Sequence, residues 1–268
     1  MDANLRARAV TAAVSLPLLV AVVGWGPEWL FALFVLLVTT AALHEYFSIA
    51  IPNRNREQYF GLIFGLALAV VMLAGDPQSL PVSLSAVLMS VFAGYPFMDG
   101  DLEERLQRLL RTLLGGCYLG MLLPCWVLLF RQAEGRAWVL WVLIIIMSGD
   151  TAAYFVGRYL GGKKLAPQIS PGKTVAGAWG YVGFGSVAGT IGAWWLFDRF
   201  HWLEALLLSV VMTVLGQLGD LFESWLKRVF SVKDFGAILP GHGGVLDRVD
   251  SLIFAAVFTT FYIRFFRS

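Results

Sequence analysis

The sequence is poor in charged residues and in cysteine. Only 14% of its 268 residues are charged and 58% are hydrophobic, which excludes an ordinary soluble domain. The two cysteines, Cys117 and Cys125, lie in one apolar segment, which excludes a disulfide framework and a cysteine zinc site. The formal net charge of +2 leaves no broad basic surface for nucleic acid. The composition therefore predicts an integral membrane protein that binds no nucleic acid.

Long apolar segments recur along the chain between short polar breaks. A helix needs about 20 mostly apolar residues to cross a bilayer, so the pattern predicts an all-α polytopic bundle of about nine transmembrane helices. The expected spans are 9–25, 28–51, 58–75, 80–98, 111–131, 137–160, 175–197, 202–228 and 250–266. No soluble domain is left between them, so residues 1–268 are expected to form one membrane domain. Its chemistry is expected in 136–268, after the N-terminal spans in 1–135.

The basic residues predict an orientation. Lys and Arg prefer cytoplasmic connections, and with the N-terminus inside, most of the 20 basic residues fall on that side. The polar connections 161–174 and 229–249 are separated by two spans and therefore emerge together. Both are expected to face the cytoplasm, where a hydrophilic metabolite can reach them.

Carboxylates inside apolar spans are candidate functional residues, because a charge in lipid needs a partner or a polar cavity. Asp150 lies in the expected span 137–160, and Asp220 lies about two turns inside the span 202–228. On a helix, Asp220, Glu223 and Lys227 share one face. A simple ion pair between Glu223 and Lys227 near the helix end is the alternative for that pair, but it leaves Asp220 unexplained.

The last span begins with a second acidic pair, Asp247 and Asp250, close to the helix N-terminus. N-capping explains one carboxylate but not two beside Arg248. Hard divalent cations such as Mg²⁺ take oxygen ligands, commonly one or two carboxylates with substrate phosphates. The sequence therefore predicts Mg²⁺ bound by Asp220 and Asp247, with Glu223 and Asp250 as further ligands or supporting partners. A second metal ion is left open.

The two cytoplasmic connections carry groups that suit phosphates. The stretch KDFGAILPGHGGVLDRVDS, residues 233–251, is rich in glycine, and backbone amides in such loops can cradle phosphate oxygens. His242 is expected to shape this loop rather than to act as an acid or base. The expected substrate-binding residues are Asp150, Ser170, Lys173, Thr174, Arg228, His242 and Arg248, with Lys227 and Lys233 as further phosphate-binding cations.

The run SWLKRVFSVKDFGAILPGHGGVLDRVD, residues 224–250, resembles the signature of phosphatidate cytidylyltransferases, also called CDP-diacylglycerol synthases. GDTAAYFVGRYLGGKKLAPQISPGKT upstream resembles a second conserved region, so the resemblance covers about residues 140–260. Gly172 and Ala176 depart from the usual pattern, in which relatives carry Lys and Glu. The resemblance implies that CTP and phosphatidate give CDP-diacylglycerol and pyrophosphate, with Mg²⁺, in a bacterial inner membrane. It also implies catalytic roles for Asp220, Lys227, Lys233 and Asp247.

Two other functions stay open at this point. CTP-dependent polyprenol and dolichol kinases are similar in having many spans and using CTP. An ion transporter would instead use Asp150, Asp220 and Asp247 as an ion site within the membrane. The clustering of acidic residues beside a glycine-rich loop, and the lack of an apparent repeat, disfavour a transporter. Membrane lipids are expected around the chain, and a homodimer is an alternative that the sequence does not decide.

Overall fold

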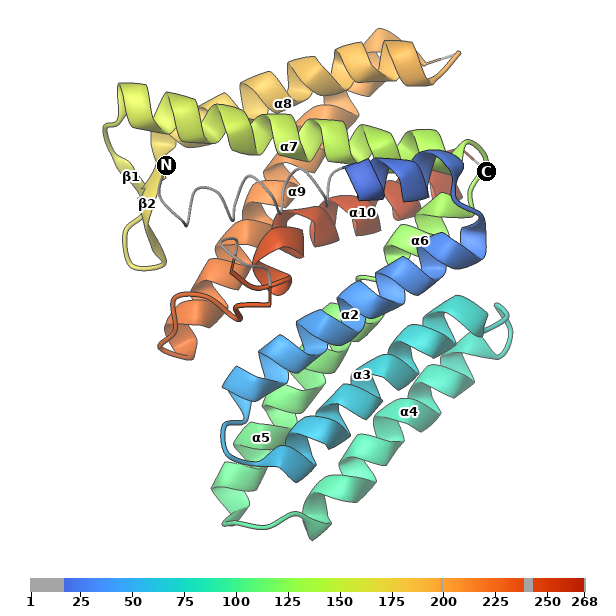
Figure 1. Cartoon of the computed structure of the whole chain (residues 1–268), viewed down its shortest axis with the longest axis vertical. Coiled ribbons are helices and arrows are strands. Elements are labelled where there is room, and N and C mark those ends of the chain that lie inside the picture. Colours follow the sequence, from blue (N-terminus) through green and yellow to red (C-terminus); the bar gives the residue numbers. More distant parts are fainter. Residues whose placement is uncertain (1–16, 199, 239–242, 268) are drawn as a thin grey trace. The chain divides into compact units, whose positions relative to one another are not determined.

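The structure is a computed structural model that describes residues 17–198, 200–238 and 243–267 (Figure 1). The chain divides into two compact units, and each takes its residues from two stretches of sequence. The first unit draws on Met1–Leu128 and Asp234–Asp247, and the second draws on Leu129–Lys233 and Arg248–Ser268. Residues 234–247, which belong to the region that resembles the family signature, are therefore part of the first unit although they follow residues of the second unit in the sequence.

The first unit is built from helices that run alongside one another (Figure 1). They are α2 (Glu28–Ala50), α3 (Asn55–Ala74), α4 (Leu80–Gly94) and α5 (Leu102–Gly115), and a π-helical turn (Gly116–Met121) leads from α5 toward α6 (Cys125–Phe130). Buried Phe64, Leu68, Val91 and Tyr95 form one core cluster. At the start of α5, the Asp101 carboxylate accepts the Glu104 amide at 2.8 Å, which caps the helix.

A buried ion pair joins α3 to α5. Arg108 Nε lies 2.7 Å from Glu57 Oε2, and the two side chains are only 9% and 4% exposed. The guanidinium also bonds the backbone carbonyl of Asp99. Arg108 also pairs with Glu104 at 3.1 Å, but the buried Glu57 carboxylate depends on Arg108 for its compensation.

Replacing Arg108 by Met is expected to destabilise the protein by about 3–5 kcal/mol, because the Glu57 carboxylate would stay buried without its cation. Thermal unfolding in detergent measures the loss. Arg105→Met is the matched control, because Arg105 lies on the same helix, is only half-buried and donates to the backbone carbonyl of Pro96. Adding Glu57→Gln to Arg108→Met should recover part of the loss. Equal melting temperatures for the Arg105 and Arg108 variants would contradict the expectation.

The second unit holds two long neighbouring helices, α7 (Gly135–Leu160) and α8 (Val175–Leu196), joined by a short hairpin (Figure 1). The hairpin pairs β1 (Lys164–Ala166) with β2 (Ser170–Thr174) in antiparallel register. The helices α9 (Trp202–Val229) and α10 (Leu246–Phe266), the latter from Arg248 onward, complete the unit. Glycines on α8 permit close packing: a Cβ on Gly185 would lie 3.0 Å from the Ile145 carbonyl oxygen of α7.

The all-α membrane architecture is confirmed, with the small hairpin as an addition. Within the described ranges, seven helical segments are long and apolar enough to cross a membrane. They are Glu28–Ala50, Asn55–Ala74, Leu80–Phe97, Leu102–Phe130, Gly135–Leu160, Trp202–Val229 and Leu246–Phe266. Helix α8 matches the expected span 175–197 and contains no charged residue, although it is not among these seven segments. Of the expected span 9–25, residues 17–25 are helical, and residues 9–16 lie outside the described residues.

Candidate functional site

The second unit contains a cavity of about 370 Å³ that brings several predicted residues together. Asp150 comes from α7, Lys173 and Thr174 come from β2, and Asp220 comes from α9. The rest of the polar lining comprises Tyr154, Arg158, Tyr181 and Gln217. Carboxylates and cations that are far apart in the sequence therefore share one concave surface, which is the usual form of a small-molecule site.

The hairpin places Lys173 beside α9. The Thr174 hydroxyl accepts the Gly177 amide at 3.0 Å and caps α8, so β2 ends where α8 begins. Arg228 Nε donates to the Ile169 carbonyl at 3.0 Å and holds the hairpin turn against α9. Lys173 Nζ then lies 2.5 Å from Asp220 Oδ2. Gly172 lines the cavity and has open space where a side chain would begin. The position at which relatives carry a lysine is therefore open in this chain.

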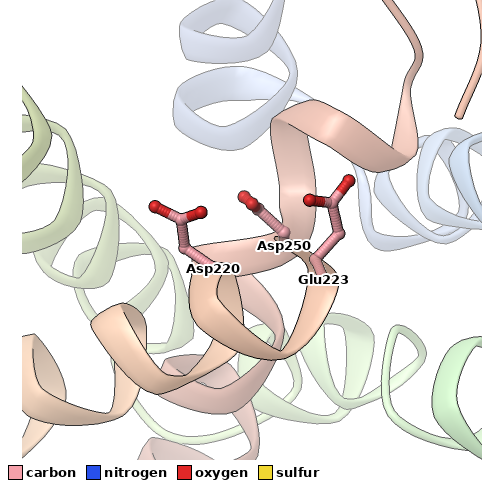
Figure 2. A group of neighbouring side chains, drawn as sticks. All are labelled: Asp220, Glu223 and Asp250. Atoms are coloured by element: carbon pink, nitrogen blue, oxygen red, sulfur yellow. The ribbon is translucent and has the colours of Figure 1, made fainter. Parts of the chain in front are cut away.

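Three carboxylates of the second unit converge beside the cavity (Figure 2). Asp220 and Glu223 lie on α9 and Asp250 lies on α10, and one oxygen from each is within 4.8 Å of the others. Glu223 is fully buried and Lys227 Nζ lies 2.5 Å from its Oε2, so the pair expected from helical spacing is present inside the cluster. Asp220 belongs both to this cluster and to the cavity lining.

This donor set fits a hard divalent cation. All three candidate ligand atoms are carboxylate oxygens, and Mg²⁺ prefers oxygen ligands over nitrogen or sulfur. Asp250 is 8% exposed and Glu223 is fully buried, so neutralising these negative charges with a cation would relieve the cost of burying them.

Asp247 belongs to the first unit, where its carboxylate accepts backbone amides of the loop that leads into α10. Its Oδ2 accepts the amides of Phe235 and Gly244 at 3.2 and 2.9 Å. Gly243 adopts φ +85°, a conformation that favours glycine, so this stretch is a tight turn. Asp247 is the second residue of α10, and the two amides that it accepts precede the helix, so these hydrogen bonds are not the N-capping that the sequence offered as the alternative for one carboxylate.

The other predicted binding residues are more exposed. Ser170 is half-buried at the start of β2, whereas Arg228, Lys233 and Arg248 are exposed. Arg228 is partly committed to the hairpin through its bond to Ile169. His242 lies outside the described residues.

Glu45 on α2 is a buried carboxylate that was not predicted from the sequence. This carboxylate is 2% exposed, and it accepts the Val245 and Leu246 amides, each at 3.0 Å. The signal was present, because Glu45 is a carboxylate inside an apolar span and the rule that selected Asp150 and Asp220 applies to it equally. Tyr181 and Gln217 of the cavity lining carried no such signal, since neither is charged.

A helical membrane protein whose carboxylates and basic side chains line one cavity has the features of a membrane enzyme with a polar substrate. The profile described as "Cytidylyltransferase family" matches residues 6–266. The chain therefore belongs to the cytidylyltransferase family.

Curated relatives from bacteria carry the name phosphatidate cytidylyltransferase. The Staphylococcus haemolyticus relative is 32% identical over 258 residues, which cover 93% of this chain and 95% of the relative. The Staphylococcus epidermidis relative is 34% identical over 240 residues, 83% of this chain and 85% of the relative. The Bacillus subtilis relative is 41% identical over 154 residues, 57% of each chain. The similarity thus extends through both units.

Proposed function

We propose that the cavity of the second unit is the nucleotide site of a phosphatidate cytidylyltransferase. The chain is a CTP-dependent nucleotidyltransferase of phospholipid biosynthesis. A phosphate oxygen of phosphatidate attacks the α-phosphorus of CTP, the new P–O bond forms, and the bond to the β-phosphate breaks. CDP-diacylglycerol and pyrophosphate are the products. The observation that carries the site assignment is the position of Asp220, which lines the cavity and belongs to the three-carboxylate cluster.

The residues around the cavity would bind and orient the substrates. An ionised phosphate is already a nucleophile, so no side chain has to remove a proton, and positioning with charge neutralisation remains as the main task. Lys173 and Lys227 would turn from their carboxylates toward phosphate oxygens, with Ser170 and Thr174 as hydroxyl donors. Arg228, Lys233, Arg248 and His242 stay predicted substrate-binding residues, and Asp150 would hold donor groups of the nucleotide.

Asp220, Glu223 and Asp250 would hold Mg²⁺, and Asp247 stays a predicted metal ligand. When bound, the ion neutralises negative charge on the phosphates and lowers the barrier to attack at phosphorus. A second ion is the alternative to a single one.

We place the site at the cytoplasmic face of a bacterial-type inner membrane, where CTP is dissolved and phosphatidate is in the lipid. This orientation follows from the positive-inside rule. Membrane lipids surround the helices, and a homodimer stays a prediction.

Purified protein with labelled CTP and phosphatidate tests this function. We expect CDP-diacylglycerol and one pyrophosphate per turnover, loss of activity on chelation of divalent metal, and recovery when Mg²⁺ is restored. Release of CDP with a phosphorylated polyprenol would identify a lipid kinase instead. Ion flux into liposomes that needs no CTP would identify a transporter. Full activity in chelator would contradict the metal assignment.

A further inference from the structure

A buried carboxylate on α2 reaches the beginning of α10 across about two hundred residues of sequence. Glu45 Oε1 accepts the Val245 amide and Oε2 accepts the Leu246 amide, both at 3.0 Å. Leu246 is the first residue of α10, and the first amides of a helix have no acceptor within the helix. A negative charge at this end is also favoured by the helix dipole. Glu45 therefore supplies from another helix what an N-cap residue usually supplies locally.

The loop is shaped to fit this carboxylate. A Cβ on Gly236 would lie 2.2 Å from Glu45 Oε1, and a Cβ on Gly244 would lie 2.7 Å from Glu45 Oε2. Both distances are below van der Waals contact, so these glycines make the room in which the carboxylate sits. Next to Glu45, the Tyr46 ring stacks on the Phe235 ring with centroids 6.1 Å apart, and both residues are fully or almost fully buried.

A second carboxylate, that of Asp247, accepts other amides of the same loop. Asp247 accepts the amides of Phe235 and Gly244, while Glu45 accepts the next two amides in the chain, those of Val245 and Leu246. Three consecutive amides are thus oriented by two carboxylates. If either carboxylate is lost, the hydrogen bonds that fix the other are weakened, because they share the same short backbone segment.

We propose that Glu45 is a positioning residue for the reaction: it fixes the backbone of 243–246, and through it the Asp247 carboxylate, in the arrangement that receives the metal and phosphate groups. The inference rests on the proposed role of Asp247. Glu45 touches neither substrate nor metal in this assignment. Its contribution is to keep the first turn of α10 formed before the substrates bind, so that the binding energy is not spent on ordering the loop.

The test compares Glu45→Gln with Glu28→Gln, an exposed carboxylate at the beginning of the same helix. Gln has the shape of Glu, but its amide nitrogen would face a backbone amide, so one hydrogen bond is lost without a cavity. We expect kcat to fall about 10–100-fold, as for other supporting residues of metal sites, and the Mg²⁺ concentration for half-maximal activity to rise several-fold. Glu28→Gln should match the wild type in both.

A merely structural role would lower the melting temperature and the yield of folded protein, but it would leave kcat per folded molecule and the Mg²⁺ dependence unchanged. That result would overturn the proposal. Hydrogen exchange provides a second measurement: the amides of 244–246 should be protected in the wild type and exchange faster in Glu45→Gln. If Glu45→Gln folds poorly, Gly236→Ala, which displaces the carboxylate instead of removing it, is expected to give the same kinetic change.

Asp220→Asn, assayed in parallel, separates this inference from the proposed function. Inactive Asp220→Asn together with wild-type kinetics and exchange in Glu45→Gln would overturn only the role of Glu45. Active Asp220→Asn would overturn the site assignment itself. Loss of activity in both variants, with a shifted Mg²⁺ dependence and faster amide exchange in folded Glu45→Gln, supports both.

Discussion

Asp220→Asn is expected to lower the rate of CDP-diacylglycerol formation by at least about 10²–10³-fold, the usual cost of removing one group that stabilises charge in a transition state. Asp220 contributes to two features at once: it lies 2.5 Å from Lys173 and shares the carboxylate cluster with Glu223 and Asp250. Asparagine keeps the shape but removes the charge, so the metal loses a ligand and Lys173 loses its partner. Turnover with labelled CTP at saturating Mg²⁺ measures the loss.

The matched control for this variant is Glu204→Gln. Glu204 lies in the first turn of the same helix and pairs with Arg267 at 3.0 Å, away from the residues that line the cavity. It should change stability slightly and turnover little. A binding measurement with Mg²⁺ alone refines the comparison, because Asp220→Asn should bind the ion more weakly and Glu204→Gln should not. Near-normal turnover of folded Asp220→Asn would contradict the metal assignment.

Helix positions could largely be predicted from the sequence, because apolar length decides them. The expected spans 28–51 and 202–228 correspond to α2 (Glu28–Ala50) and α9 (Trp202–Val229). The hairpin could not be predicted, since strands of three and five residues give no periodicity and depend on contacts such as that of Arg228 with Ile169. The division into two units could not be predicted from the sequence either, because residues 234–247 pack with helices that precede them by more than a hundred residues.

The candidate site, too, could be predicted from the sequence only in part. Helical spacing was enough to place Asp220, Glu223 and Lys227 on one face of α9, and the structure has them there. Which acidic residue of the last span joins them depends on how α9 meets α10, and the structure brings in Asp250. The role of Glu45 depends on a contact with residues 200 and 201 positions away, which no local pattern encodes.

Gly219→Ala is expected to damage the site without changing any polar group. A Cβ on Gly219 would lie 2.5 Å from the Asp250 carbonyl oxygen, and 3.5 Å from the Cα of Ser251. These are backbone atoms of α10, so they cannot move aside as a flexible side chain does, and α9 and α10 must separate. Because Asp220 and Glu223 follow Gly219 on α9 and Asp250 lies on α10, separating the two helices would spread the three carboxylates apart. Overpacking of this kind typically costs about 1–3 kcal/mol.

We therefore expect Gly219→Ala to lower turnover about 10–100-fold and to raise the Mg²⁺ requirement, since metal geometry tolerates little displacement. Gly183→Ala is the control, because a Cβ on Gly183 of α8 meets nothing within 4 Å. It should keep full activity and gain slightly in stability, as alanine favours a helix over glycine by about 1 kcal/mol. Turnover and the Mg²⁺ concentration for half-maximal activity are measured for both variants. If Gly219→Ala matches Gly183→Ala in both measurements, close contact of α9 and α10 does not set the geometry of the three carboxylates.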